Sequence, residues 1–122
     1  MLDSALMCLA VAIFHEGRGE TQKGQYAIAE VIHNRTQNNK FPSNYCDVIK
    51  QKGQFSFYKN PNSLKPPTKE KESWEEAKEV AKNFSKKKTN YTKGAVFFNT
   101  NRLGVRFKPT TIPCRIGGHT FY

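Results

Sequence analysis

The feature that most constrains the fold is an apolar run at residues 6–14, which two glycines soon follow. Asp3 or Ser4 can cap a helix here. Apolar side chains recur on one wide face of that helix: Leu6, Leu9, Ala10, Ile13 and Phe14. The spacing predicts a buried helix over residues 3–15. We expect Gly17 and Gly19 to break it, which places Glu16 at the helix end or in the turn beyond.

The same run could be mistaken for a membrane span or a signal peptide. At nine residues it is too short to cross a bilayer, which takes about 20. Only Asp3 and Ser4 precede it as polar residues, no Lys or Arg does, and no small-residue cleavage site follows. We therefore expect no transmembrane segment and no export signal.

Two more long helices and a short one are predicted downstream. The second should run from Thr21 or Gln22 to about Arg35, with a buried stripe of Ala27, Ile28, Val31 and Ile32. A turn at 38–43 precedes a short helix at about 45–51, and the aromatic, turn-rich stretch 53–67 could line a cleft. The third long helix should begin near Ser73, which with Glu76 has the spacing of a capping box. Its inner face consists of Trp74, Ala77, Ala81 and Phe84.

The pattern changes after Tyr91. A strand-like run at 95–98 follows Gly94, and another at 119–122 follows Gly117 and Gly118. Helices followed by two or three short strands predict an α+β fold, mostly helical, with a small antiparallel sheet toward the C-terminus. At 122 residues the chain has room for one core only, so we expect a single domain over 1–122.

The charge is strongly positive and unevenly distributed. The net charge is +10, yet residues 1–34 carry −2, so residues 35–122 carry +12. Such a basic surface favours a polyanionic partner, whether nucleic acid, an anionic membrane or an anionic cell wall. Charge alone does not choose among them.

Cys8, Cys46 and Cys114 are odd in number and far apart. We expect reduced, structural thiols rather than a disulfide between Cys46 and Cys114. A zinc site is less favoured still, because zinc sites normally draw on tightly spaced ligand pairs.

The stretch from Glu16 to Glu20 is the strongest candidate for chemistry, with two carboxylates flanking Arg18 and two glycines that let the backbone turn sharply. Glycoside cleavage needs a protonated carboxylic acid to supply a proton to the leaving oxygen. Glu16 follows an apolar helix, and semi-burial there would favour its neutral form. The plainer interpretation is a surface turn with an ion pair between Glu20 and Arg18.

Other catalytic chemistries find little support. His15 and Glu16 would need a histidine at position 19 for a zincin motif, and that residue is Gly19. A nucleophile elbow and a phosphate-binding glycine loop are both missing. Cys8 lies within the apolar helix, where a thiolate would be costly, and we interpret His33 as structural.

Several segments resemble, in order, the signature of SleB-type cell wall hydrolases, the spore-cortex-lytic family that also includes phage lysins. The first are residues 12–20, Gly24-Gln25 and residues 27–35. The resemblance continues through Phe41-Pro42, Val48-Ile49 and residues 53–56, and closes with residues 94–99 and 116–121. It therefore covers essentially the whole chain. Two departures are Gly17 for a usual Ala and Phe14 for a frequent Tyr.

The resemblance implies a lysozyme-like domain that cleaves the glycan strand of peptidoglycan between N-acetylmuramic acid and N-acetylglucosamine, as a lytic transglycosylase that needs no cofactor or metal. Glu16 inherits the role of the family's catalytic acid. Glu20 either binds substrate or holds Arg18 and the turn in place. The other residues assigned to substrate binding or support are Arg18, Gln25, Gln54, Phe98, Asn99 and His119.

Two rival functions stay open at this point. An N-acetylmuramoyl-L-alanine amidase would need a zinc site, which His15, His33 and His119 could supply only by chance. A small basic nucleic-acid-binding protein would fit the charge, but the segments that carry the resemblance lie mostly in the acidic first third, so we expect no nucleic-acid partner. We expect a monomeric phage endolysin that binds peptidoglycan, is attracted to the anionic cell envelope and stays in the host cytoplasm until released to the wall.

Overall fold

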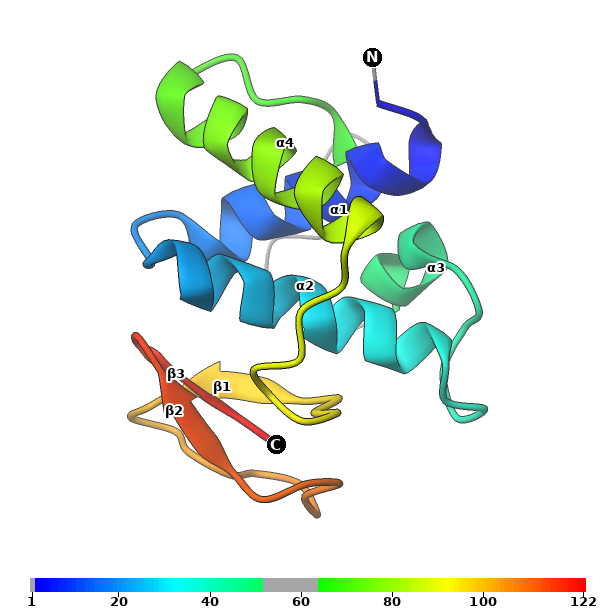
Figure 1. The fold of residues 1–122 in the computed structure, drawn as a ribbon, viewed down its shortest axis with the longest axis vertical. Coiled ribbons are helices and arrows are strands. Elements are labelled where there is room, and N and C mark those ends of the chain that lie inside the picture. The colour runs from blue at the N-terminus through cyan, green and yellow to red at the C-terminus, as the bar shows by residue number, and fades with distance from the viewer. Residues whose placement is uncertain (1, 52–63) are drawn as a thin grey trace.

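The structure is a computed structural model that describes residues 2–51 and 64–122. Within these two ranges, four helices come first, and three short strands follow near the C-terminus (Figure 1). This confirms the α+β, mostly helical, lysozyme-like fold that the sequence predicts. Among the described residues, no helix has the length and apolarity needed to cross a membrane.

The first two helices begin where the sequence predicts, and a polar side chain caps each of them. Helix α1 (Ser4–Gly17) is capped by Asp3, whose carboxylate accepts a hydrogen bond from Leu6 N at 2.9 Å. Helix α2 (Gln22–Thr36) is capped by Thr21, whose hydroxyl accepts from Gly24 N at 3.2 Å. The short α3 (Tyr45–Lys50) is capped by the side chain of Asn44.

Helix α1 continues two residues beyond the predicted end, so that Gly17 belongs to its last turn. Gly17 is buried, and a Cβ there would lie 3.1 Å from Ile28 Cδ1 and 3.2 Å from Gln25 Cγ. The helix therefore ends within the break predicted at Gly17 and Gly19, although Gly17 itself is still helical. Its small size permits close packing of α1 on α2, and Gly19, with φ of +86°, makes the turn.

The prediction of a capping box at Ser73 was wrong. Helix α4 spans Lys71–Lys86, so Ser73 lies inside its first turn. The N-cap is Glu70, which adopts a left-handed conformation and makes no side-chain capping bond. The predicted inner face of α4 is confirmed, since all four of its residues are buried: Trp74, Ala77, Ala81 and Phe84.

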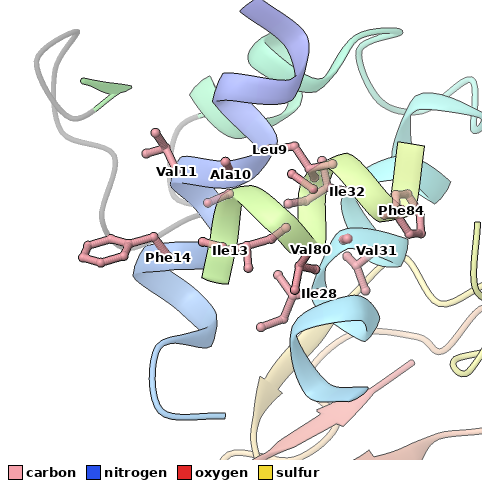
Figure 2. Close-up of a cluster of buried hydrophobic side chains, with 14 of the residues drawn as sticks. Leu9, Ala10, Val11, Ile13, Phe14, Ile28, Val31, Ile32, Val80 and Phe84 are labelled. Carbon is pink, nitrogen blue, oxygen red and sulfur yellow. The ribbon is translucent and has the colours of Figure 1, made fainter. Parts of the chain in front are cut away.

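The core lies where α1, α2 and α4 meet. Figure 2 shows Ile13 of α1, Val80 of α4 and Ile28 of α2 among the side chains gathered there, all 1% exposed or less. The predicted stripe of α2 is fully buried, but burial extends to its other side and includes Glu30. Helix α2 is therefore the central element, with α1 and α4 on one side and the sheet on the other (Figure 1).

The sheet consists of β1 (Phe98–Thr100), β2 (Cys114–Ile116) and β3 (His119–Phe121) in the antiparallel order β1-β3-β2. The strand predicted at 119–122 is confirmed, whereas that at 95–98 begins only at its last residue. Residues 95 and 96 are held to α2 instead. The side chains of Asn34 and Arg35 donate hydrogen bonds to Ala95 O at 2.9 Å and Val96 O at 2.7 Å.

The cysteine prediction was wrong as well. Cys8 of α1 and Cys46 of α3 form a disulfide, and only Cys114 is a free thiol. The pairing follows from helix packing: α1 and α3 lie side by side, which brings the two Cα atoms to 5.3 Å, within the usual range for a disulfide. The spacing of the cysteines in the sequence does not indicate that α1 and α3 are in contact.

Candidate active site

Glu16 occupies the last turn of α1, where its residue is half-buried. This confirms its predicted place at the helix end. Its neighbour His15 is also half-buried, and its ring meets that of Phe14 edge-on. Burial, reinforced by the nearby Arg18 guanidinium, lowers the pKa of His15 below its usual value. Glu16 therefore lies at the boundary between the apolar core and solvent.

The plainer interpretation of this stretch, an ion pair between Arg18 and Glu20, is wrong, because Arg18 pairs with another residue. Its guanidinium forms an ion pair of 2.5 Å with Glu70, the residue that precedes α4. It also lies over the Phe14 ring, 4.9 Å from the ring centroid. Arg18 thus links the end of α1 to the start of α4.

Glu20 connects the helices to the sheet. Its Oε1 accepts a hydrogen bond of 2.8 Å from the backbone N–H of Gly118, in the turn between β2 and β3. The same oxygen lies 3.8 Å from His119 Nδ1, and the side chains of both residues are mostly shielded from solvent. A Cβ at Gly117 would lie 2.3 Å from Glu20 Oε1, so the absence of a side chain there lets the carboxylate approach.

His119 and Phe98 form one cluster beside Glu20. The Phe98 ring meets the His119 ring edge-on at 5.3 Å and stacks on Phe121 at 5.7 Å. Both residues are half-buried, on the neighbouring strands β1 and β3. The structure therefore brings Glu20, Phe98 and His119 together, although nearly 100 residues separate the first from the last.

Gln25 is buried, and its amide joins three elements. Its Nε2 donates to Glu76 Oε1 of α4 at 2.8 Å and to the backbone oxygen of Glu20 at 3.3 Å. Together they border a small pocket of about 190 Å³, which is also lined by Phe14, Arg18, Ser73 and Ala77. Glu76 is the site residue that sequence reasoning missed, because its spacing from Ser73 suggested a capping role.

Asn99 serves the sheet rather than this pocket. Its amide nitrogen donates to Gly104 O at 3.1 Å and to the Tyr122 hydroxyl. These bonds hold the segment that follows β1. Gln54, the remaining predicted site residue, lies outside the described residues.

Metal ligands are not grouped in the part of the chain that the structure describes, where no three of the His, Cys, Asp and Glu side chains could hold one ion. His33, which we interpreted as structural, contacts the Tyr45 hydroxyl at 2.9 Å and the Phe84 ring edge-on. Burial and the nearby Lys88 lower its pKa.

Comparison with known proteins places the chain in a family. A spore cortex-lytic enzyme of Halalkalibacterium halodurans is 43% identical over 47 residues, which cover 38% of this chain and 14% of that enzyme. No solved structure matches. The pattern that defines the family described as cell wall hydrolase matches residues 19–122, which include Glu20, Gln25, Phe98 and His119. The chain therefore belongs to the cell wall hydrolase family.

Proposed function

We propose that the protein cleaves the glycan strand of bacterial peptidoglycan as a lytic transglycosylase, with Glu16 as its catalytic acid and base. Family membership supports a cell wall substrate. Glu16 lies just before the matched residues, so its role rests on the motif resemblance and on its position. The observation that carries the proposal is the place of Glu16, half-buried in the last turn of an apolar helix.

Glu20 has a positioning role in this proposal. Its carboxylate accepts a backbone hydrogen bond from Gly118 and lies beside His119, so it fixes the sheet against the helices. Glu16, half-buried at the end of an apolar helix, has the environment that general acids of glycosidases use.

The reaction needs one such group. Glu16, protonated, would donate its proton to the oxygen that links N-acetylmuramic acid to N-acetylglucosamine as the glycosidic bond breaks. The resulting carboxylate would then remove the proton from the C6 hydroxyl of the muramic acid. That oxygen bonds to C1 and closes a 1,6-anhydro ring, so the proton returns to Glu16 and no water is consumed.

The test uses Glu16→Gln, which keeps the shape of the side chain and cannot donate a proton. We expect the fold to be intact and lysis of purified walls to fall by roughly 10²- to 10⁴-fold, the usual contribution of general acid catalysis. Glu20→Gln should reduce lysis less. Activity of Glu16→Gln within a few-fold of the unmodified protein would remove Glu16 from the mechanism, and a reversed order would assign the acid to Glu20.

The products identify the bond that is cut. Mass spectrometry of digested walls should show anhydro-muramic ends. Reducing muramic ends would indicate a hydrolytic muramidase instead, and free stem peptides an amidase. Activity should also survive a strong chelator, whereas loss with chelator and recovery with zinc would favour the amidase.

The remaining expectations concern where the protein acts. We propose that its basic surface attracts it to the anionic envelope and that it works as a monomer, which size-exclusion chromatography would check. That it is a phage endolysin, held in the host cytoplasm until lysis, stays a prediction. Fractionation of infected cells would test it.

A further inference from the structure

Two adjoining hollows of about 630 and 380 Å³ lie at the C-terminal end of α2, the end farther from Glu16. They share part of their lining, so they form one continuous surface, which we call the amide–aromatic surface. Amide and hydroxyl side chains dominate the first hollow: Asn34, Gln37, Asn38, Asn39 and Thr110. Rings and a lysine mark the second: Phe41, Phe97, Phe107 and Lys108.

The amide side of this surface offers both donors and acceptors. Gln37 and Asn39 are exposed, and Asn38 is half-buried, with its carbonyl oxygen accepting from Lys40 N at 2.9 Å. Asn34 is tied to Ala95 O and so fixes the floor. Amides that present N–H and C=O groups together match hydroxyl and N-acetyl groups, which also both donate and accept.

The aromatic side is a supported platform. The Phe97 ring contacts the Phe41 ring at 6.2 Å and the Phe107 ring at 5.0 Å. Arg35, buried at 3% exposure, lies against the rings of Phe41 and Phe97 with its guanidinium 5.0 and 5.6 Å from their centroids. Phe107 is nevertheless 55% exposed. A large ring held in place but left open to solvent is typical of a binding surface.

We propose that the amide–aromatic surface is a second binding site for the N-acetylated glycan strand of the wall, separate from the cleavage site. A sugar ring has polar edges, which amides bind, and a C–H face, which packs on an aromatic ring. Lys40 and Lys108 would complement the carboxylates of the stem peptides that the muramic acid residues carry. The inference rests on the proposed function only in taking the wall glycan as the ligand.

Two other occupants fit the lining less well. A nucleic acid would call for several Arg and Lys side chains, whereas four amides and two lysines line these hollows. A lipid surface would use the neighbouring exposed Leu103 as readily as Phe107. The Glu16–Glu20 stretch leads into the first turn of α2, and the amide–aromatic surface begins at the last turn of that helix, which has 15 residues and is about 22 Å long. One glycan strand can therefore engage both sites, which raises its local concentration at the cleavage site.

The first experiment is a titration of the ¹⁵N-labelled protein with the tetramer of N-acetylglucosamine, followed by NMR. We expect the side-chain amide signals of Gln37, Asn38 and Asn39 and the backbone signal of Phe107 to shift together with one Kd. Shifts confined to residues around Glu16 and Glu20 would overturn the proposal.

The second experiment compares Phe107→Ala with Leu103→Ala, a matched control, because Leu103 is 54% exposed in the same segment but lines neither hollow. Both are made in Glu16→Gln and in the unmodified protein, and binding to purified wall sacculi is measured by co-sedimentation in the cold. We expect Phe107→Ala to weaken binding about three- to tenfold, the range for loss of one aromatic contact, and Leu103→Ala to leave it unchanged.

If Phe107→Ala and Leu103→Ala bind sacculi equally well, the proposal is overturned. It is also overturned if both substitutions weaken binding to phosphatidylglycerol vesicles equally, because the segment would then be a lipid-binding surface. Cleavage of a short soluble glycan should be the same in both variants. The two proposals fail separately. If Phe107→Ala alone loses sacculus binding but the unmodified protein cleaves no glycan, the second binding site stands and only the proposed function is refuted.

Discussion

The contact between Glu20 and the β2–β3 turn can be measured with two glycines that differ in one respect. Gly117 and Gly104 both adopt left-handed conformations, with φ of +58° and +61°. A Cβ added at Gly104 meets no atom within 4 Å, whereas one at Gly117 would lie 2.3 Å from Glu20 Oε1. Alanine at each position therefore has the same backbone cost, and only Gly117→Ala displaces the carboxylate.

The magnitudes follow from these two terms. The left-handed conformation costs a residue with a Cβ roughly 1–2 kcal/mol, and this applies to both variants. At Gly117 the flexible Glu20 side chain must also swing away and give up its hydrogen bond to Gly118 N, a bond to a charged group worth about 1.5–3 kcal/mol. We expect Gly104→Ala to lose only the first amount and Gly117→Ala to lose both.

Urea unfolding followed by circular dichroism measures the difference. With m of about 1–3 kcal/mol per M, the midpoint of Gly117→Ala should lie about 1 M below that of Gly104→Ala, with m unchanged. In a Glu20→Ala background the carboxylate is gone, and the two glycine substitutions should then cost the same. If they already cost the same in the unmodified protein, Glu20 does not hold the sheet to the helices, and its positioning role must be abandoned.

Three further predictions concern other parts of the molecule. Cys46→Ala removes the disulfide to Cys8, which closes a 38-residue separation, and should lower the free energy of unfolding by about 4 kcal/mol; no change after reduction of the unmodified protein would contradict this. The buried Glu30 carboxylate accepts four hydrogen bonds from residues 89–92, and Glu30→Gln leaves only one carbonyl oxygen to accept them. We expect this substitution to lower the free energy of unfolding by roughly 1–3 kcal/mol, measured by thermal or urea unfolding. Glu79→Gln, on the exposed face of α4, is its control. Replacing Lys86, Lys87 and Lys88 with glutamine should slow lysis of whole envelopes, as added salt does, because exposed charges act over only about 8 Å at physiological salt. Cleavage of a short soluble glycan should be unchanged. Equal loss of activity on both substrates would mean that these lysines belong to the active site or are needed for the stability of the fold.

The sequence by itself determined the helices. Capping by Asp3 and Thr21 and the apolar stripes of α1, α2 and α4 depend on residues within one or two turns of each other, so the periodicity carries them directly. The sequence-based prediction of a helix start was wrong where a local signal competed with packing. Ser73 has the spacing of a cap, yet α4 begins two residues earlier, at Lys71, just after Glu70, which pairs with Arg18 of a distant turn.

The sequence also identified most members of the candidate site but not their relations. Its motifs singled out Glu16, Glu20, Gln25 and His119, and it placed Glu16 at the end of a buried helix. That Glu20 bonds to Gly118, 98 residues away, and Gln25 to Glu76, 51 residues away, was invisible to it. Glu76 was accordingly missed.

Tertiary structure alone decided the pairings across long separations. The disulfide of Cys8 with Cys46 depends on α3 packing beside α1, and the buried place of Glu30 depends on the backbone of residues 91–92 returning to α2. Local pattern records how a segment divides its side chains between core and solvent. It does not record which other segment will cover a given face, because that depends on the path of the whole chain and on the fit of surfaces that meet only once it has folded.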